Sequence, residues 1–218
     1  MIKRATKPAR PVKPAKPVTS EGPALPPIVQ AGHPVLRGKA ALVTPERLAS
    51  PDFAALVKTM TDVMRKAPGV GLAAPQIGVD LQLIVLEDAE HLMSRLGPEQ
   101  REARGRVAFP LRVIANPVLE LRGEARATFF EGCLSVPGYM ALVERALEVE
   151  VTGIDERGDS VRWTVSGWPA RILQHEVDHL RGTLYVDRML PRTFSANAEV
   201  QARWLSMSPA EVRAALEA

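Results

Sequence analysis

Two histidines four residues apart, with a glutamate directly after the first, form the clearest chemical pattern in the sequence. His175, Glu176 and His179 lie in the run Gln-His-Glu-Val-Asp-His, inside a stretch with helical apolar spacing. Residues four apart on an α-helix lie about 40° apart around the axis and roughly 6 Å apart along it, so both imidazoles can face one divalent metal. Glu176 lies beside them, where it can handle a proton on a water at that metal. The pattern predicts metal-dependent hydrolysis.

The helix alone leaves such a metal short of ligands, because catalytic sites of this kind hold three protein ligands and one open position. No histidine follows His179, and the acids that follow it are Asp187, Glu199, Glu211 and Glu217. Upstream, Cys133 lies in a compact Gly-containing loop predicted over residues 131–138, and a thiolate is a strong ligand for Zn²⁺ or Fe²⁺. A Cys-His-His site therefore fits the sequence better than two histidines and an acid.

The helices and strands that must position these residues are predicted from the spacing of apolar residues and from the turn- and cap-forming residues between them. Ser50-Pro51-Asp52 opens an amphipathic helix over residues 51–66, and the metal helix spans about 167–181 with Gly182 as its stop. Strand-like segments are predicted at 81–86, 112–115, 119–121, 126–130, 147–154, 160–165 and 184–186, with residues 88–110 as a surface excursion and helical segments again at 199–205 and from 209.

Consecutive strands favour an α+β fold over a parallel doubly wound one. The expected architecture has mixed or antiparallel sheets packed around a central metal-binding helix, with an N-terminal helix and a C-terminal helical extension. The expected divisions are a basic Pro-rich disordered tail at 1–27, a catalytic domain at 28–190 and the extension at 191–218.

Charge is unevenly distributed along the 218 residues. The formal net charge is +3, but residues 1–20 hold six basic side chains and no acid, which leaves 22 basic against 25 acidic side chains in the remainder. The remainder is thus mildly acidic, which excludes a nucleic-acid-binding domain on charge grounds. Residues 7–18 repeat every three residues, as polyproline II does, so the tail is either a solvated disordered segment or a rod whose basic edge contacts phosphates such as those of ribosomal RNA.

The cysteine count and the hydropathy of the sequence indicate the cellular compartment in which the protein works. A single cysteine permits no intrachain disulfide and fits a reducing compartment. The apolar runs are under ten residues, too short to span a bilayer, and the basic N-terminal segment is not amphipathic as a transit peptide would be. We expect a bacterial cytoplasmic protein rather than an organellar one, without membrane contact or a specific nucleic-acid sequence as partner.

Three segments together resemble a known family. Gly-Val-Gly-Leu-Ala-Ala-Pro-Gln at 69–76, Glu-Gly-Cys-Leu-Ser at 131–135 and Gln-His-Glu-Val-Asp-His at 174–179 are similar in identity, order and approximate spacing to the three motifs of peptide deformylase. The resemblance implies a metal-dependent amidohydrolase that removes the formyl group from the N-formylmethionine of nascent polypeptides and releases formate. It also implies one divalent metal per chain, expected to be Fe²⁺ in the cell and replaceable by Zn²⁺, Ni²⁺ or Co²⁺.

The resemblance assigns roles by motif position. The implied metal ligands are Cys133, His175 and His179. A water activated by the metal attacks the formyl carbon, with Glu176 as general base and then general acid. Gln76 and the backbone N–H of Leu134 become the donors to the developing oxyanion.

The substrate side is a hypothesis built on the same segments. On the helical face of His175, Trp168 and Ile172 could line an apolar pocket for a methionine side chain together with Val70, although these positions equally suit core residues. An extended peptide could pair with a sheet edge formed near the remaining pocket candidates, Gly69, Gly71, Glu131 and Gly132. Asp178 is either an outer residue that orients a ligand or a surface acid of the helix.

Three alternatives make different predictions. A zinc endopeptidase requires a third ligand after the helix, and its metal binding would survive Cys133→Ala. A structural metal module requires a closed set of four ligands, whereas the chain offers one cysteine and two well-placed histidines. An inactive relative would have a broken ligand set or lack the glutamate, and neither defect is present.

Overall fold

The computed structural model describes residues 24–94 and 96–217. The basic edge predicted for residues 7–18, and its contact with phosphates, lies outside the described residues. Leu25, which the sequence places in the tail, packs against a core cluster of the catalytic part. None of the helices in the described part of the chain has the length and apolar character needed to cross a membrane.

The strands form one antiparallel sheet in the order β1-β2-β3-β4-β5, and β6 pairs with β4 off this path. Their bounds are Gly71–Ala73 (β1), Leu83–Asp88 (β2), Phe109–Cys133 (β3), Val136–Ile154 (β4), Ser160–Ser166 (β5) and Ser195–Ala196 (β6). The two longest strands, β3 and β4, pair along most of their length. The α+β class expected from the sequence is confirmed, with antiparallel pairing throughout the described strands.

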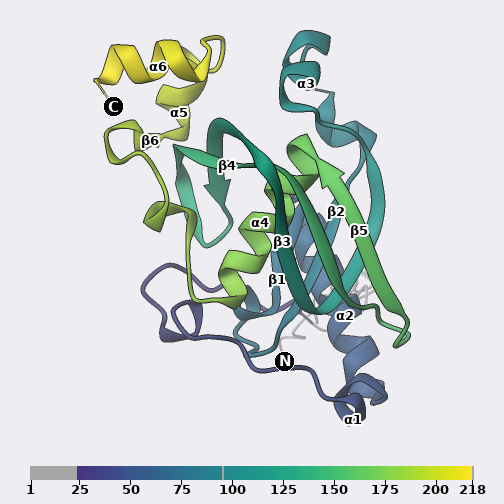
Figure 1. Ribbon diagram of the computed structural model, residues 1–218. Coiled ribbons are helices and arrows are strands. Elements are labelled where there is room, and N and C mark those ends of the chain that lie inside the picture. The colour runs from purple at the N-terminus through teal and green to yellow at the C-terminus, as the bar shows by residue number, and fades with distance from the viewer. Residues whose placement is uncertain (1–23, 95, 218) are drawn as a thin grey trace, which may run out of the picture.

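The helices lie on both sides of this sheet (Figure 1). The α-helices are Pro45–Leu48 (α1), Pro51–Lys66 (α2), Pro98–Arg104 (α3), Gly167–Leu180 (α4), Asn197–Glu199 (α5) and Pro209–Leu216 (α6). The 3₁₀ turns are Pro34–Leu36 (η1), Ala74–Ile77 (η2), Glu90–Met93 (η3), Tyr185–Asp187 (η4) and Pro191–Thr193 (η5), and Val200–Trp204 (η6) is π-helical. The predicted helix at 51–66 is confirmed in both bounds.

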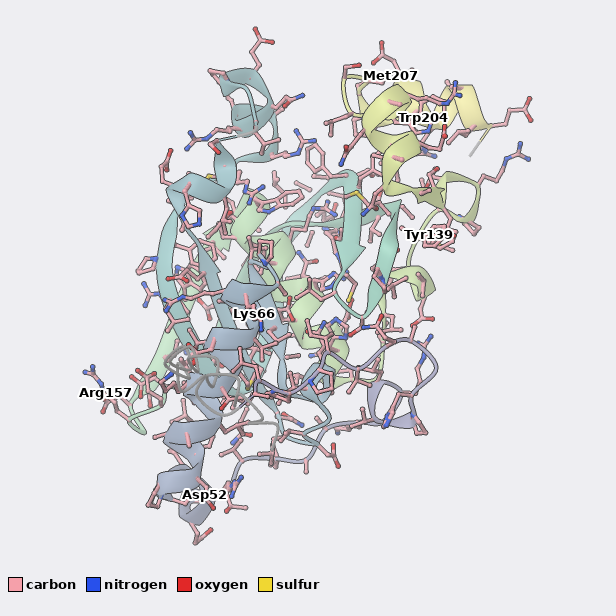
Figure 2. All side chains as sticks on the ribbon, turned by 180° about the vertical axis from the view of Figure 1, so that it is seen from behind. Asp52, Lys66, Tyr139, Arg157, Trp204 and Met207 are labelled. Atoms are coloured by element: carbon pink, nitrogen blue, oxygen red, sulfur yellow. The ribbon has the colours of Figure 1, made fainter. Side chains whose placement is uncertain are left out.

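Alternation along β2 divides the core into two layers. Ile84 and Leu86 belong to the cluster that packs on α4, whereas Leu83 and Val85 belong to the cluster that packs on α2. Successive side chains of a strand point to opposite faces, so one strand serves both layers. Figure 2, seen from behind, shows α2 on its face of the sheet, from Asp52 near its start to Lys66 at its end. Helix α4 is thereby packed on one face of the sheet and α2 on the other.

Helix α4 lies in the middle of the molecule and is buried over nearly its whole length (Figure 1). One of its buried polar side chains ties the helix to β4: Gln174 bonds both the N–H and the C=O of Ala146, at 3.0 and 2.9 Å. The helix ends as the sequence predicts, with Gly182 at φ +73°. The N–H of Thr183 donates to the carbonyl of Asp178, and that of Gly182 to His179, which together make a Schellman motif.

The breaks that the sequence suggests between three short strands are irregularities inside the single strand β3. Its register with β4 shifts between Ala115 and Val118 and again between Arg122 and Arg126. Asn116 has φ +51°, and its amide bonds the backbone N–H and C=O of Val43 at 2.8 and 2.9 Å. The turn-forming residues bend the strand without ending it, because pairing with β4 resumes after each shift.

Two local expectations were wrong. The compact loop expected at 131–138 is a tight hairpin, in which Cys133 pairs with Val136 at the end of β3 and the start of β4. The strand expected at 184–186 is the 3₁₀ turn η4, and the N–H of Leu184 donates to the carboxylate of Asp187 at 2.7 Å. A side-chain acceptor three residues along stabilises a turn where apolar residues alone suggest a strand.

Candidate metal and substrate site

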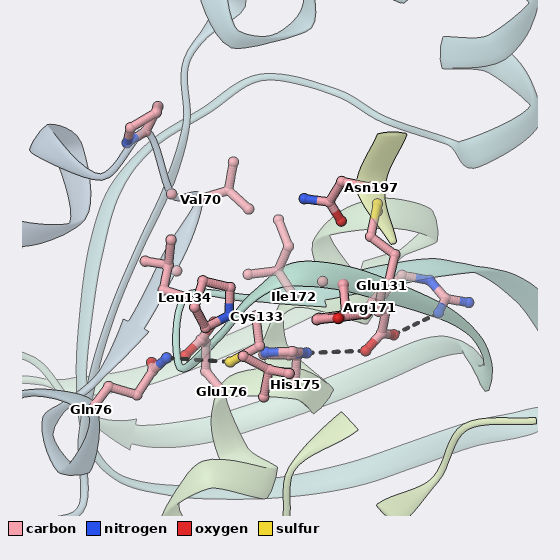
Figure 3. Close-up of a pocket in the computed structure, with 18 of the residues that line it drawn as sticks. Val70, Gln76, Glu131, Cys133, Leu134, Arg171, Ile172, His175, Glu176 and Asn197 are labelled. Atoms are coloured by element: carbon pink, nitrogen blue, oxygen red, sulfur yellow. Dashed lines mark hydrogen bonds and ion pairs between the residues drawn. The ribbon is translucent and has the colours of Figure 1, made fainter. Parts of the chain in front are cut away.

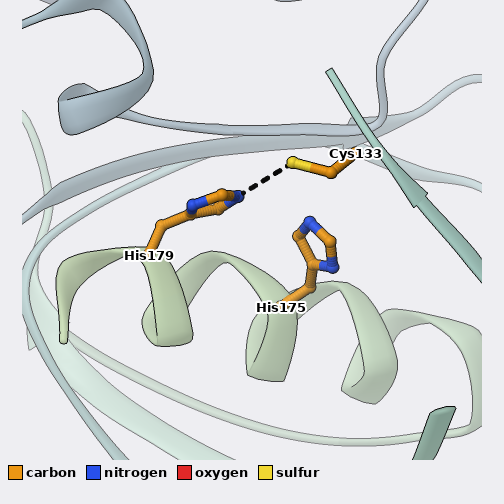
Figure 4. A group of neighbouring side chains, drawn as sticks. All are labelled: Cys133, His175 and His179. Atoms are coloured by element: carbon orange, nitrogen blue, oxygen red, sulfur yellow. Dashed lines mark hydrogen bonds between the residues drawn. The ribbon is translucent and has the colours of Figure 1, made fainter. Parts of the chain in front are cut away.

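The end of β3 brings Cys133 against the two histidines of α4 (Figure 4). One ligand atom from each of Cys133, His175 and His179 lies within 4.8 Å of the others, and Sγ of Cys133 lies 3.2 Å from Nε2 of His179. A soft thiolate with two imidazoles suits Fe²⁺ or Zn²⁺. Cys133 and His175 also line a cavity, so the side left open for a further ligand faces it. The three residues fit one divalent metal ion.

Glu131 fixes the orientation of His175. Its carboxylate lies 3.0 Å from Nδ1 of His175, which leaves Nε2 of that ring for the metal group. Burial alone would lower the pKa of His175, but its interactions with Cys133 and Glu131 outweigh burial and raise it. For His179, burial and then the charge of His175 hold the pKa well below its usual value, which keeps that imidazole neutral and able to bind a metal.

A buried network of ion pairs supports Glu131. Arg145 donates two hydrogen bonds to Glu131, at 2.9 and 3.0 Å, and a third to Asp178. Arg171 also donates to Glu131, at 2.6 Å, and Arg188 donates twice to Asp178, at 2.6 and 2.7 Å. Burial opposes ionisation of Glu131, yet its bonds to His175 and Arg145 lower its pKa. Asp178 is 4% exposed and lies in this network, not on the helix surface.

Glu176 is 4% exposed, and burial raises the pKa of its carboxyl group to about 7. Its Oε1 lies so close to the β1 backbone that a Cβ added at Gly71 would be 2.3 Å away. The group that approaches the backbone at Gly71 is thus the Glu176 carboxylate. Glycine is the residue that permits this contact.

Gln76 is held from one end and points its amide nitrogen at the metal group (Figure 3). Its Oε1 accepts from the N–H of Ala73 at 2.9 Å. Its Nε2 lies 3.3 Å from Oγ of Ser135 and 3.5 Å from Sγ of Cys133. The side chain is 2% exposed, so the donor is fixed in place before any substrate arrives.

A cavity of about 430 Å³ opens beside these groups, and apolar surface predominates along its wall. Every pocket residue predicted from the sequence lines it: Gly69, Val70, Gly71, Glu131, Gly132, Trp168 and Ile172. Gln76, Leu134, Cys133, His175 and Glu176 line it as well. The structure thus brings the three sequence segments to one concave site.

Unpaired polar atoms gather at this site. Among the described residues, four buried side-chain polar atoms have no hydrogen-bond partner: Nε1 of Trp168, Oε2 of Glu176, Nδ1 of His179 and Oδ1 of Asn197. Trp168, Glu176 and Asn197 line the cavity, and His179 belongs to the metal group. Buried polar groups in proteins are normally paired, so exceptions gathered at one cavity mark it as the place where a ligand is bound.

Sequence reasoning missed several residues of the site. Arg145 and Arg171 are buried and bonded to Glu131, and Asn197 reaches the cavity from the C-terminal part. Arg171 could have been suspected as a charged residue on the apolar side of the metal helix. Arg145 and Asn197 have no neighbouring pattern that predicts their partners. The remaining histidines, His33 and His91, are exposed and lie outside the site.

The three-residue metal group distinguishes the alternatives. None of the acids that follow α4 belongs to it within the described part of the chain, where the group consists of Cys133, His175 and His179. A third ligand after the helix, which an endopeptidase of this pattern requires, is therefore not observed there. The fourth ligand that a closed structural site needs is likewise missing from the described group.

Comparisons with known proteins agree with this geometry. Residues 25–194 match the family model described as polypeptide deformylase. A chloroplastic peptide deformylase 1A from Solanum lycopersicum is 53% identical over 171 residues, covering 78% of this chain and 62% of that protein. Peptide deformylase 1 from Streptomyces coelicolor is 48% identical over 190 residues, covering 87% of this chain and 85% of that protein. The chain thus spans less than two thirds of the plant relative and most of the bacterial one.

The fold has solved counterparts. A crystal structure of a class I type b peptide deformylase from Acinetobacter baumannii, described as Met-Ala-Ser bound, aligns with a TM-score of 0.67 and 34% sequence identity. The alignment covers 76% of this chain and 99% of that one.

Proposed function

Because this chain belongs to the polypeptide deformylase family, we propose that it removes the N-terminal formyl group from the formylmethionine of newly made polypeptides and releases formate. The observation that carries the proposal is the meeting of Cys133, His175 and His179 beside the buried Glu176 at one cavity. A relative of known structure is described as bound to Met-Ala-Ser, the peptide that deformylation of formyl-Met-Ala-Ser would leave.

The ligand residues and the proton carrier have separate tasks. Cys133, His175 and His179 would hold a divalent metal, which would lower the pKa of a water to near neutral and favour negative charge on the formyl oxygen. Glu176 takes the proton of the attacking water and returns it to the departing amine nitrogen. Its unpaired Oε2 is free to accept that proton, and the β1 backbone against Oε1 limits where the carboxylate can move.

The developing oxyanion needs donors that are already in place. Gln76 can offer Nε2, since its Oε1 is tied to the N–H of Ala73 and the side chain cannot turn freely. Leu134 can offer its backbone N–H from the hairpin turn that also carries Cys133. A preorganised donor of this kind contributes about 3–4 kcal/mol to transition-state stabilisation.

The cavity wall suits an extended peptide with an apolar first side chain. Ile172 and Trp168 lie one and two turns before His175 on α4 and line the cavity, and Val70 lies across it from Ile172 (Figure 3). We propose that they hold the methionine side chain. The outer edges of β1 near Gly71 and of β3 near Gly132 flank the same space, so the peptide main chain can pair there as an added strand.

The identity of the metal, the cellular location and the contact with the ribosome are further proposals. We propose Fe²⁺ as the metal in the cell, with Zn²⁺, Ni²⁺ or Co²⁺ able to replace it, because the thiolate and imidazole donors suit each of these ions. We also propose a bacterial cytoplasmic location and contact of residues 1–20 with the ribosome surface. The support for that contact is the charge of the segment, six basic side chains and no acid.

A substrate panel tests the proposed function. Metal-loaded protein should release formate from formyl-Met-Ala-Ser and leave acetyl-Met-Ala-Ser intact, because an acetyl carbon is more hindered and less electrophilic than a formyl carbon. It should cleave no internal bond. Formate and free amine are measured together by enzyme-coupled detection and mass spectrometry. Cleavage at internal peptide bonds without formate would instead support the endopeptidase alternative.

Gly71→Ala should damage catalysis more than folding. The new Cβ would lie 2.3 Å from Oε1 of Glu176, so the carboxylate must shift, and a misplacement of about 1 Å can cost 10²-fold in rate. We expect kcat on formyl-Met-Ala-Ser to fall about 100-fold with little change in thermal stability.

Gly97→Ala is the matched control, because a Cβ there meets nothing within 4 Å. Equal kcat values for the two variants would show that the contact between Gly71 and Glu176 does not position the carboxylate.

A further inference from the structure

The C-terminal segment contributes a wall of the substrate cavity. Strand β6 pairs with the start of β4, with Met140 opposite Ser195 and Tyr139 opposite Ala196. The next residue, Asn197, lines the cavity together with Tyr139 and Met140. Asn197 lies beyond residue 194, where the match to the family model ends. It is therefore a feature of this chain that the family pattern does not cover.

The side chain of Asn197 has an unused acceptor. Its Oδ1 is buried and has no hydrogen-bond partner among the described residues. Figure 3 shows the Asn197 side chain reaching into the cavity from the side opposite Gln76. An amide oxygen held out of water without a donor raises the free energy of the free enzyme, and a ligand donor that pairs with it gains binding.

The position of Asn197 shows which part of a peptide it meets. The inner end of the cavity lies at the buried Glu176, whereas Asn197 is half-buried and its neighbour Tyr139 is 46% exposed. A peptide with its formyl group at the metal must leave past this outer rim. Alternate residues of an extended chain point to the same side, so the third side chain follows the first about 7 Å further out. The crystal structure of the related Acinetobacter baumannii protein is described as bound to a tripeptide, Met-Ala-Ser.

We propose that Asn197 is a specificity-determining residue that reads the third residue of the substrate. Its Oδ1 accepts a hydrogen bond from a side-chain donor there, so peptides with serine or threonine at that position react faster than those with apolar residues of the same size. The inference rests on the proposed deformylase function, since it assumes where the formyl group lies.

Threonine and valine provide the test, because they have the same shape and differ by a hydroxyl in place of a methyl group. Formate release from formyl-Met-Ala-Thr and formyl-Met-Ala-Val is measured with wild-type protein and with Asn197→Leu, Asn197→Asp and Glu199→Gln. We expect wild type to favour threonine about 5-fold in kcat/KM, the value of one typical hydrogen bond. Asn197→Leu should lose that preference, and Asn197→Asp should keep it because an acceptor oxygen remains.

Glu199→Gln is the control variant for this test. Glu199→Gln changes an exposed side chain in the same helical turn, paired with Arg203, and should keep the wild-type ratio. An unchanged ratio in Asn197→Leu, or its loss in Asn197→Asp, overturns the inference while the proposed function stands. No formate from either peptide with wild type overturns the proposed function, and the inference falls with it. If Asn197→Leu does not fold, Asn197→Ala removes the same oxygen.

Discussion

Glu176→Gln should lower kcat for formate release about 10²- to 10⁴-fold while one metal ion per chain remains bound. Glutamine keeps the size of the side chain but cannot accept a proton, and loss of a positioned general base costs a factor in this range. Glu176 is buried, and its Oε2 is unpaired among the described residues. Bulk water therefore cannot easily take over its role as general base. Steady-state rates and metal analysis of the same preparation check both halves of the prediction.

Stability distinguishes this effect from misfolding. Replacing a buried, unpaired carboxylate by a neutral amide removes a desolvation cost, so the thermal midpoint should not fall. Glu148→Gln, an exposed change on β4 outside the cavity, is the control and should leave kcat unchanged. A Glu176→Gln variant with full metal content and a kcat within 10-fold of wild type would remove the proposed proton carrier from the mechanism.

Arg145→Met should destabilise the fold by about 3–5 kcal/mol in urea unfolding. Arg145 is 5% exposed and bridges Glu131 and Asp178, and both carboxylates are themselves buried. Removing one partner of a buried ion pair leaves uncompensated charge, and losses of this size are typical. Metal affinity should fall as well, because Glu131 would no longer be held in position to orient His175.

Two further variants calibrate that loss. Arg145→Lys keeps a charge but loses the two-pronged geometry, so its stability should lie between wild type and Arg145→Met. Arg162→Met removes a pair with Glu150 in which the arginine side chain is 70% exposed, and it should cost less than about 1 kcal/mol. If Arg145→Met costs no more than Arg162→Met, the buried network does not hold the site together.

The sequence predicted the parts of this site that depend on local periodicity. His175, Glu176 and His179 share one helix, so their relative placement follows from helical geometry, and the helix formed where apolar spacing and Gly182 indicated. Cys133 was paired with them only through the missing ligand and the family resemblance, because its distance from α4 depends on the whole sheet. The same applies to Gln76, whose approach to Cys133 joins two distant segments.

Contacts between distant segments explain what could not be predicted. The bond between Arg145 and Glu131 depends on the β3–β4 register, which shifts three times along the strands. Asn197 reaches the cavity only because β6 pairs with β4 after a long return of the chain. Asn116 and Pro117 look like a strand end, but the tertiary bonds of Asn116 to Val43 accommodate the break inside β3. Local propensity does not contain this information.

A metal titration tests the central claim most directly. Metal-free protein is titrated with Fe²⁺ under anaerobic conditions, and the initial rate of formate release from formyl-Met-Ala-Ser is measured at each addition. The rate should rise linearly to one equivalent per chain and then stay constant, since Cys133, His175 and His179 form one three-residue site. Absence of formate at full occupancy, or a rate that keeps rising to two equivalents, would contradict a single Cys-His-His metal centre as the deformylating site.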